Sequence, residues 1–286
     1  MPFRRLSSLL AICTLFVGAY LLGGCVGGAS DSDAFKIAIA NEEPYGYLDE
    51  NGRATGEAPE IARVIAKKLG TAPVEVVNVE WKALIPGLRA GRFDAIAAGM
   101  YITPERAESV LFTDPTYRIG EAFLVAAGNP KGLHSYQDIV ASADAQLGVV
   151  QGTVEVDYAK KLGVPDGRLT IFADNATAAL AVKNDQVDAF AGTALTIQTI
   201  ADKYGADSGV ERAEPFEQPV IDGKPVYGYG AFAFAPDNQQ MRDRWNAELV
   251  RFIGSAEHLA LVEPFGFTAA ELPGKTMREV LEAAAK

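Results

Sequence analysis

The sequence GRFDAIAAGM at residues 91–100 contains the elements from which the fold can be worked out. Its apolar part, residues 93–98, has the length and composition of a strand that is buried on both faces. A short helix is expected over residues 81–90, and Gly91 is a typical residue to end it. A helix that leads directly into a buried strand indicates an α/β sheet.

The same alternation of strands and helices continues on both sides of this stretch. Strands are predicted at residues 35–40, 74–79, 147–150, 169–172, 187–191 and 228–235, and helices at 58–69, 156–162, 175–183 and 238–253. The first of these helices carries Ile61, Val64, Ile65 and Leu69 on one stripe and ends at Gly70. The pattern starts again near residue 147, so we predict one α/β sheet in each half of the chain.

The first 24 residues read as a secretion signal. Arg4 and Arg5 precede an apolar stretch at residues 9–22, and Gly23 and Gly24 lead to Cys25. This ending resembles the bacterial lipobox, in which the cysteine is lipidated and becomes the new N-terminus. The alternative is a transmembrane anchor, but the apolar run is short for a span of about 20 residues. We therefore expect a lipid anchor on Cys25, a tether over residues 25–34 and an extracytoplasmic location at the cell membrane.

Composition excludes several classes of function. The net charge is −11, from 26 basic and 37 acidic residues, which disfavours nucleic-acid binding. The two cysteines, Cys13 and Cys25, both lie near the N-terminus, and the two histidines, His134 and His258, are far apart. We therefore expect no metal, no cofactor and no cysteine or histidine chemistry in the folded body.

Several sequence blocks resemble the polar-amino-acid class of ABC-transporter substrate-binding proteins, solute-binding protein family 3. The blocks are residues 91–100, 103–106 (TPER), 112–115 (FTDP), 148–153 (GVVQGT) and 185–189 (DQVDA), in the order that the family shows. The resemblance implies a two-lobed periplasmic-binding-protein fold of type II, with the ligand in a cleft between lobes joined by two hinge strands. It also implies a monomer that delivers a small zwitterion to ABC permease subunits by hinge closure.

The resemblance also suggests where the lobes begin and end. Lobe 1 is expected over residues 35–125 and 229–286, and lobe 2 over residues 126–228. The hinge strands are expected near residues 123–127 and 228–232.

The chain looks closest to one subgroup, the binders of the compatible solutes ectoine and hydroxyectoine, which serve osmoprotection. The blocks that carry this resemblance are residues 41–47 (NEEPYGY), 56–60 (GEAPE), 84–88 (LIPGL), 98–106 (AGMYITPER), 230–234 (GAFAF) and 264–267 (PFGF). General amino-acid binders usually read Gly-Phe-Asp-Val-Asp where this chain has GEAPE.

Arg106 is the residue expected to hold the ligand's carboxylate, because its planar fork can bind two oxygens at once. Thr103 would add a hydroxyl or a backbone N–H. The alternative is a surface arginine at a helix start, paired with Glu105 or Asp114.

The resemblance implies an aromatic box made of Tyr45, Trp81 and Tyr101. Ectoine is a cyclic amidine whose delocalised positive charge suits aromatic faces. Amino-acid binders commonly carry Ser or Thr where this chain has Tyr101. The alternative is that all three rings simply fill the core.

Glu42 and Glu155 are the candidate acceptors for the ligand's N–H groups, and solvated carboxylates are the alternative. The turn at residues 152–154 is also expected to offer backbone N–H groups to the ligand's carboxylate. Amino-acid binders hold the ligand's α-ammonium with an acid at the position of Thr193, which has no charge. This difference argues against a standard amino acid as ligand.

Two other functions compete with ectoine binding. One is import of a polar or cationic amino acid such as glutamine or arginine. The other is a dehydratase or lyase on the same fold, which the sequence disfavours because the cleft carboxylates have no His, Cys or metal partner.

Overall fold

Two β-sheets organise the chain in the computed structural model, which describes residues 34–71, 73–205 and 209–284. The first sheet has the order β4-β1-β5-β15-β6, and β7 also pairs with β15. Its strands are β1 (Phe35–Ile39), β4 (Val74–Asn78), β5 (Ala95–Tyr101), β6 (Leu111–Phe112), β7 (Tyr117–Ile119) and β15 (Gly228–Phe234). β1 runs parallel to β4 and β5, whereas β15 runs antiparallel to β5, β6 and β7.

The second sheet has the order β10-β9-β11-β8-β12. Its strands are β8 (Glu121–Ala126), β9 (Leu147–Val150), β10 (Leu169–Phe172), β11 (Ala189–Thr193) and β12 (Val210–Arg212). β9 is parallel to β10 and β11, and β8 is antiparallel to β11 and β12. Two short ribbons complete the strands: β2 (Tyr47–Leu48) with β3 (Ala54–Thr55), and β13 (Val220–Ile221) with β14 (Lys224–Pro225).

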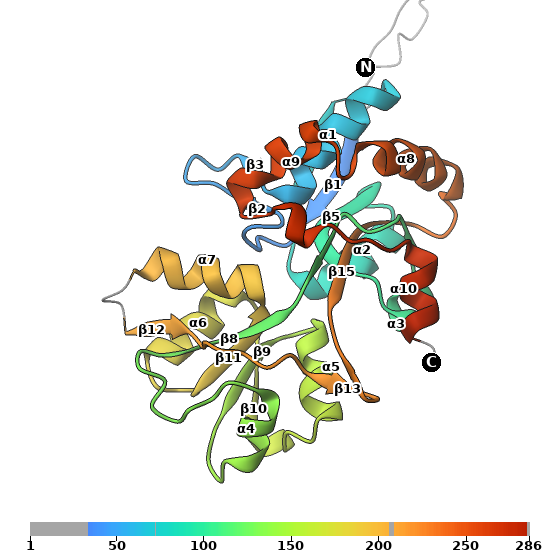
Figure 1. The fold of residues 1–286 in the computed structure, drawn as a ribbon. Coiled ribbons are helices and arrows are strands. Elements are labelled where there is room, and N and C mark those ends of the chain that lie inside the picture. Colours follow the sequence, from blue (N-terminus) through green and yellow to red (C-terminus); the bar gives the residue numbers. More distant parts are fainter. Residues whose placement is uncertain (1–33, 72, 206–208, 285–286) are drawn as a thin grey trace, which may run out of the picture. The chain divides into compact units, whose positions relative to one another are not determined.

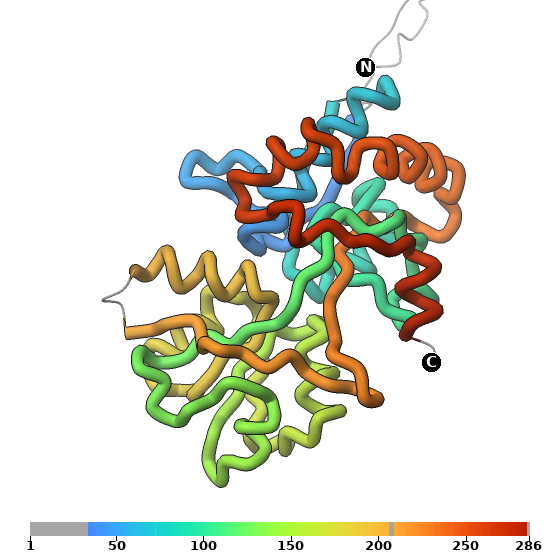
Figure 2. The backbone as a smooth tube through the Cα atoms, viewed as in Figure 1, coloured from blue at the N-terminus to red at the C-terminus, as the bar shows by residue number. Residues whose placement is uncertain are grey.

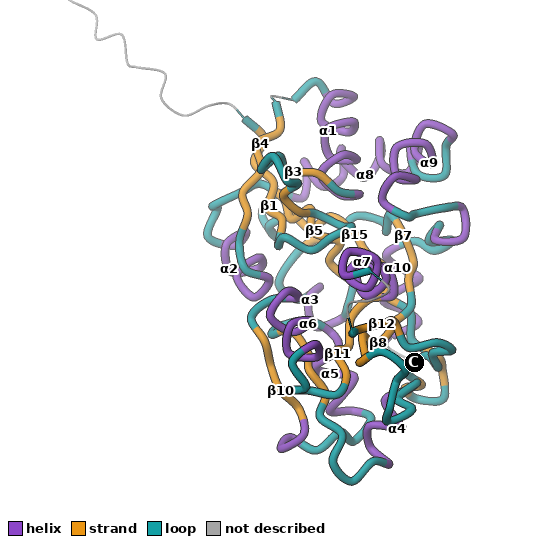
Figure 3. The backbone as a smooth tube through the Cα atoms, turned by 90° about the vertical axis from the view of Figure 1, so that its left-hand side faces the viewer, coloured by secondary structure: helices purple, strands orange, loops and turns teal. Residues whose placement is uncertain are grey.

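Helices cover both faces of each sheet (Figures 1 and 3). The first sheet packs against α1 (Glu57–Leu69), α8 (Gln239–Phe252) and α9 (Ala256–Val262) on one face, and against α2 (Leu84–Arg89) and α10 (Met277–Ala284) on the other. The second sheet packs against α4 (Tyr136–Ala141) and α5 (Val154–Lys161) on one face, and against α6 (Asn175–Lys183) and α7 (Ala194–Tyr204) on the other. α3 (Pro104–Ala107) and four 3₁₀ turns make up the rest: Trp81–Ala83, Asp166–Arg168, Glu263–Phe265 and Ala269–Glu271.

The buried residues explain why these segments form these elements. Every residue of β5 is buried, as the apolar run at 93–98 predicts. In α1 the fully buried Ile61 and Ile65 are four residues apart and share one face, and Gly70 ends the helix with φ 63° in the left-handed region. On α8, Trp245 is fully buried and its ring stacks on Phe35 with centroids 5.0 Å apart. The helical stripe predicted at residues 58–69 is therefore the core face of α1.

The chain passes between the two sheets twice. The first crossing is at Gly120, between β7 in the first sheet and β8 in the second, and the second crossing leads into β15 (Figure 2). All of β8 pairs with strands of the second sheet, so the first crossing lies before residue 121 and not near residues 123–127, as expected from the sequence. All of β15 likewise pairs with strands of the first sheet, so the second crossing lies before residue 228 and not near residues 228–232.

The secretion signal and Cys25 lie outside the described residues. No helix within residues 34–71, 73–205 and 209–284 has the length and hydropathy needed to cross a bilayer.

Candidate functional site

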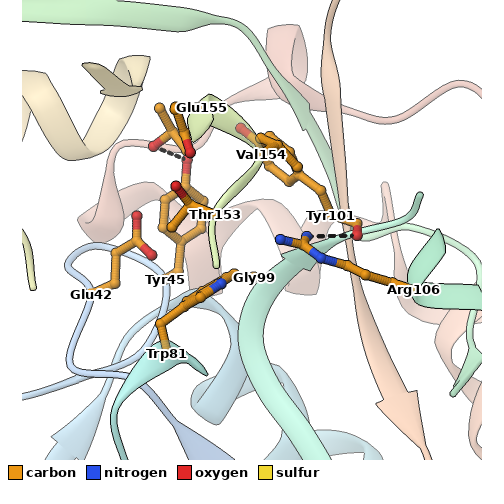
Figure 4. A pocket seen from close by; sticks show the side chains of 10 residues that line it. Glu42, Tyr45, Trp81, Gly99, Tyr101, Arg106, Thr153, Val154 and Glu155 are labelled. Atoms are coloured by element: carbon orange, nitrogen blue, oxygen red, sulfur yellow. Dashed lines mark hydrogen bonds between the residues drawn. The ribbon is translucent and has the colours of Figure 1, made fainter. Parts of the chain in front are cut away.

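One pocket between the two sheets brings together seven of the eight candidate ligand-binding residues (Figure 4). Its lining consists of Glu42, Tyr45, Trp81, Gly99, Tyr101 and Arg106 from the segments around the first sheet, and Thr153, Val154, Glu155 and Thr193 from the second. The cavity volume is about 20 Å³, which is room for a single water-sized group. The two walls therefore meet, and their polar groups bond one another.

Arg106 lies in the four-residue helix α3 and is oriented by three hydrogen bonds. Its backbone N–H donates to Thr103 Oγ1 at 3.1 Å, its Nη1 donates to the carbonyl of Tyr101 at 3.0 Å, and its Nη2 donates to the carbonyl of Gly152 at 3.1 Å. The guanidinium carbon also lies 5.6 Å from the centre of the Trp81 ring. Arg106 therefore points into the pocket and reaches the opposite wall.

Two expectations about the surroundings of Arg106 differ from the structure. Thr103 does not line the pocket, because its hydroxyl caps α3 and accepts from the Arg106 backbone. Asp114, the suggested alternative partner of Arg106, is bonded elsewhere: Oδ1 accepts from the backbone N–H of Met277 at 2.7 Å, and Oδ2 from the Asn246 amide at 3.2 Å. In the turn at residues 152–154, the Gly152 carbonyl accepts from Arg106, and the binding of a ligand carboxylate by the N–H groups of this turn stays a prediction.

The three candidate aromatic residues line the pocket and pack against the protein at the same time. Tyr45 is 1% exposed, and its ring lies 5.0 Å from that of Tyr117. Trp81 Nε1 donates to the Gly152 carbonyl at 2.9 Å. The Tyr101 ring covers Gly228, where an added Cβ would lie 1.8 Å from the ring. Core packing and a ligand box are therefore not exclusive alternatives for these rings.

A chain of hydrogen bonds crosses between the two walls. The Tyr45 hydroxyl donates to Thr193 Oγ1 at 2.9 Å, and Thr193 Oγ1 donates to Thr196 Oγ1 at 3.0 Å. Thr196 Oγ1 then donates to Glu42 Oε1 at 2.9 Å. Thr193 also caps the N-terminus of α7 by accepting from the Thr196 backbone. The sequence analysis missed Thr196, although a Thr three residues after a capping Thr is a visible signal.

The electrostatics of the pocket are dominated by carboxyl groups. Loss of solvent, and then the nearby charge of Glu155, raise the pKa of Glu42 to about 7, although the hydrogen bond from Thr196 opposes this rise. Glu155 is 4% exposed and lies in the first turn of α5. Burial lowers the pKa of Arg106, which Glu155 opposes as the strongest nearby charge. Glu42, in the pocket lining, therefore changes its charge near neutral pH.

A third carboxyl, that of Glu121, was missed by the sequence analysis. It is fully buried at the start of β8, directly opposite Thr193 in the strand pairing. Burial and then the charge of Glu155 raise the pKa of Glu121 well above its usual range. A glutamate at the first position of an otherwise apolar strand is the sequence signal that could have revealed Glu121.

A larger cavity of about 430 Å³ adjoins the pocket. The two share Glu42, Trp81 and Thr153 in their walls, and the larger one extends to the loop at residues 78–80 and to the start of α6. Trp81 and Glu42 therefore separate the inner pocket from this outer cavity. No group of metal-ligating side chains occurs within the described ranges.

Comparison with protein families agrees with this architecture. Residues 35–267 match the model of bacterial extracellular solute-binding proteins, family 3. The chain belongs to this family. Its fold is the two-lobed type II α/β fold, and it is a solute-binding protein, since its relatives are named as ABC-transporter binding proteins and not as enzymes.

Individual relatives span nearly the whole chain. A probable amino-acid ABC transporter periplasmic-binding protein of Sinorhizobium fredii is 37% identical and aligns over 98% of this chain and 94% of its own length. The solved structure of EhuB in complex with hydroxyectoine has a TM-score of 0.77 and 36% identity, and covers 87% of this chain and 94% of EhuB. An ancestral arginine-binding protein bound to arginine has a TM-score of 0.71 and 26% identity, covering 82% of this chain and 98% of its own.

Proposed function

We propose that this protein binds ectoine or hydroxyectoine outside the cytoplasm and delivers it to an ABC importer. The observation that carries the proposal is the set of three aromatic rings, Tyr45, Trp81 and Tyr101, around one pocket that also contains Arg106. The similarity to EhuB, whose solved structure holds hydroxyectoine, supports it.

The chemistry of the pocket suits a flat cation joined to a carboxylate. Arg106 can exchange its bonds to the Tyr101 and Gly152 carbonyls for bonds to a ligand carboxylate. Aromatic faces contribute about 0.5–2 kcal/mol each to holding a desolvated cation. Glu42 and Glu155 then accept hydrogen bonds from the ring N–H groups.

Thr193 argues against a ligand with a free ammonium. Its hydroxyl oxygen already accepts from Tyr45 and donates to Thr196, so it offers no charge and little spare bonding capacity. A ligand with a primary ammonium would lack the carboxylate that amino-acid binders have at this position. An amidine held by aromatic faces does not need that carboxylate.

Arginine is the second candidate ligand. Three carboxyl groups lie in or beside the pocket, and several relatives are named as arginine-binding proteins, including one from Escherichia coli at 26% identity. A guanidinium also suits aromatic faces. The three rings and the uncharged Thr193 favour the smaller cyclic zwitterion.

Attachment to the membrane through a lipid on Cys25 is part of the proposal. Metabolic labelling with a tagged fatty acid is expected to mark the wild-type protein, and Cys25→Ser is expected to abolish the label and release the protein from the membrane. Equal labelling of both proteins would refute the anchor.

Calorimetry on the soluble fragment that begins at Val26 tests the ligand. The fragment is unfolded and refolded to remove bound solute, then titrated with ectoine, hydroxyectoine, arginine, glutamine and histidine. We expect ectoine or hydroxyectoine to bind at least about a hundredfold more tightly than any amino acid, a difference of about 2.7 kcal/mol. Tighter binding of arginine would replace the first candidate with the second.

A further inference from the structure

Glu121 lies behind the ligand pocket and not in its lining. It is the first residue of β8, immediately after the crossing at Gly120, and it pairs with Thr193 across the strands. Side chains of directly paired residues project from the same face of a sheet. Thr193 lines the pocket, so Glu121 projects beside it on the same face but is fully buried and outside the lining.

The backbone of Glu121 is held at the crossing by a side chain from the returning segment. Its N–H donates to Gln218 Oε1 at 2.7 Å, and its carbonyl accepts from Gln218 Nε2 at 3.0 Å. This pair of bonds joins the two crossing segments and holds the Glu121 backbone between them. The position from which the Glu121 side chain extends is therefore fixed by both connections between the sheets.

The carboxyl group itself lacks a donor. Glu121 is 0% exposed, and neither of its oxygens has a hydrogen-bond donor among the described residues; Oε2 of Glu155 lacks one as well. The two carboxyl groups lie within reach of each other. Two buried carboxylates at this separation repel each other, and the oxygens without donors lose the bonds that they had in water. A single proton shared by the pair removes the charge repulsion and supplies a hydrogen bond, because the protonated carboxyl then donates to the other.

The surroundings decide which of the two keeps the proton. Glu155 lies in the first turn of α5, where the helix dipole favours a negative charge, and Arg106 is near enough to attract it. Glu121 has neither advantage. The titratable and charged groups that face Glu121 are Glu155 and Tyr158 on α5, Tyr136 on α4, Tyr101 on β5, and Glu42 and Tyr45 on the first loop. None of these is a cation.

We propose that Glu121 is a positioning residue that stays protonated and donates its hydrogen bond to Glu155, which fixes the Glu155 carboxylate toward the cation of the ligand. The inference rests on the proposed function, because it assigns a role to Glu155 in that function. The pair then carries one negative charge in place of two.

Infrared spectroscopy tests the proton without any ligand. The difference spectrum between wild type and Glu121→Gln at neutral pH is expected to contain the carbonyl stretch of a protonated carboxylic acid, lost in the variant. Glu57→Gln, which removes another buried acid, loses its own band while the Glu121 band remains. Absence of a lost acid band in Glu121→Gln would overturn the proposal, whatever the ligand proves to be.

Binding measurements test the positioning. Glu121→Leu removes the donor and is expected to weaken binding of the preferred zwitterion by at least about tenfold, and Glu121→Gln, which keeps a neutral donor, is expected to restore most of that loss. Equal loss in both variants, each still folded by thermal unfolding, would show that a charge and not a donor is needed, and would overturn the proposal. If wild type binds none of the solutes, the proposed function fails while the infrared result still decides the protonation of Glu121.

Discussion

Arg106 illustrates how a single side chain combines several structural constraints. Thr103 orients its backbone, and its two terminal nitrogens donate to carbonyls from opposite walls of the pocket. A planar fork can make both bonds at once, and a lysine ammonium in the same place cannot match that geometry.

Arg106→Lys is therefore expected to weaken binding of a carboxylate ligand by about tenfold or more. Calorimetry with the solute that binds most tightly in the titrations proposed above measures the effect. Arg63→Lys is the matched control, because Arg63 also donates to a backbone carbonyl, that of Ala54 at 2.7 Å, but lies away from the pocket. Similar losses in the two variants would contradict a specific role for Arg106.

Glu42 makes ligand affinity depend on pH. Its pKa of about 7 means that a large share of the protein holds this carboxyl protonated at neutral pH. A ligand cation favours the ionised form, so affinity is expected to fall as the pH is lowered from about 8 to about 6. Titrations at the two pH values measure this, and Glu42→Gln is expected to bind weakly with no such slope. A slope that persists in the variant would assign it to another group.

Glu57 is buried outside the pocket lining, so its protonation is expected to act on stability. Burial raises its pKa from 4.5 to about 8, so its contribution to stability is complete below about pH 4.5 and is lost as the pH rises toward 8. Glu57→Gln mimics the protonated form, and its melting temperature is expected to rise relative to wild type between pH 5 and pH 8. Glu50→Gln, an exposed control, should follow the wild-type profile. A constant difference between Glu57→Gln and wild type would contradict the raised pKa.

Strand β15 depends on glycine at positions where aromatic rings pack against its backbone. It connects the second crossing to the first sheet and is buried over its whole length. The Tyr101 ring packs directly against the backbone of Gly228. Gly228, the first residue of β15, therefore fixes the position of the Tyr101 ring in the pocket wall.

Gly228→Ala is expected to displace the Tyr101 ring, because the new Cβ would lie 1.8 Å from it. We expect loss of most ligand affinity and a lowered melting temperature, typical of overpacking at about 1–3 kcal/mol. Gly167→Ala is the control, since an added Cβ there has no atom within 4 Å. Unchanged affinity in Gly228→Ala would show that the ring position is unimportant.

Contacts between the walls hold the whole molecule closed. They include the chain of bonds from Tyr45 to Glu42, the bonds from Trp81 and Arg106 to the Gly152 carbonyl, and the ion pair between Lys203 on α7 and Glu43. Several of these use the same atoms that are proposed to bind ligand. Ligand entry therefore requires that the walls separate and that these bonds be exchanged.

Single-molecule fluorescence energy transfer can follow this opening, because the soluble fragment contains no cysteine of its own. Labels at Arg89→Cys and Lys160→Cys, two exposed positions on opposite sides of the pocket, are expected to show a distribution of distances that narrows and shortens when ligand is added. Labels at Arg89→Cys and Glu108→Cys, both on the side of the first sheet, should not respond. A response of the control pair, or none in the first pair, would contradict hinge closure.

Much of the fold could be read from local patterns. The strands at 147–150 and 169–172 and the helix at 175–183 have the predicted bounds, and β1, α1, β15 and α8 agree within one or two residues. Periodic burial and helix ends such as Gly70 depend on neighbours in the sequence, which is why they were predictable. The pocket residues were predicted through the family resemblance, and seven of the eight lie together.

Local sequence patterns were enough to predict the two α/β halves and the acidic body without cysteines, and the family resemblance supplied the residues expected in the pocket. The crossing at Gly120, the chain of hydrogen bonds from Tyr45 to Glu42 and the closeness of Glu121 to Glu155 became visible only in the folded protein. These facts depend on which strands pair and which helix ends meet. Such contacts join residues far apart in the chain, and no local pattern of polarity encodes them.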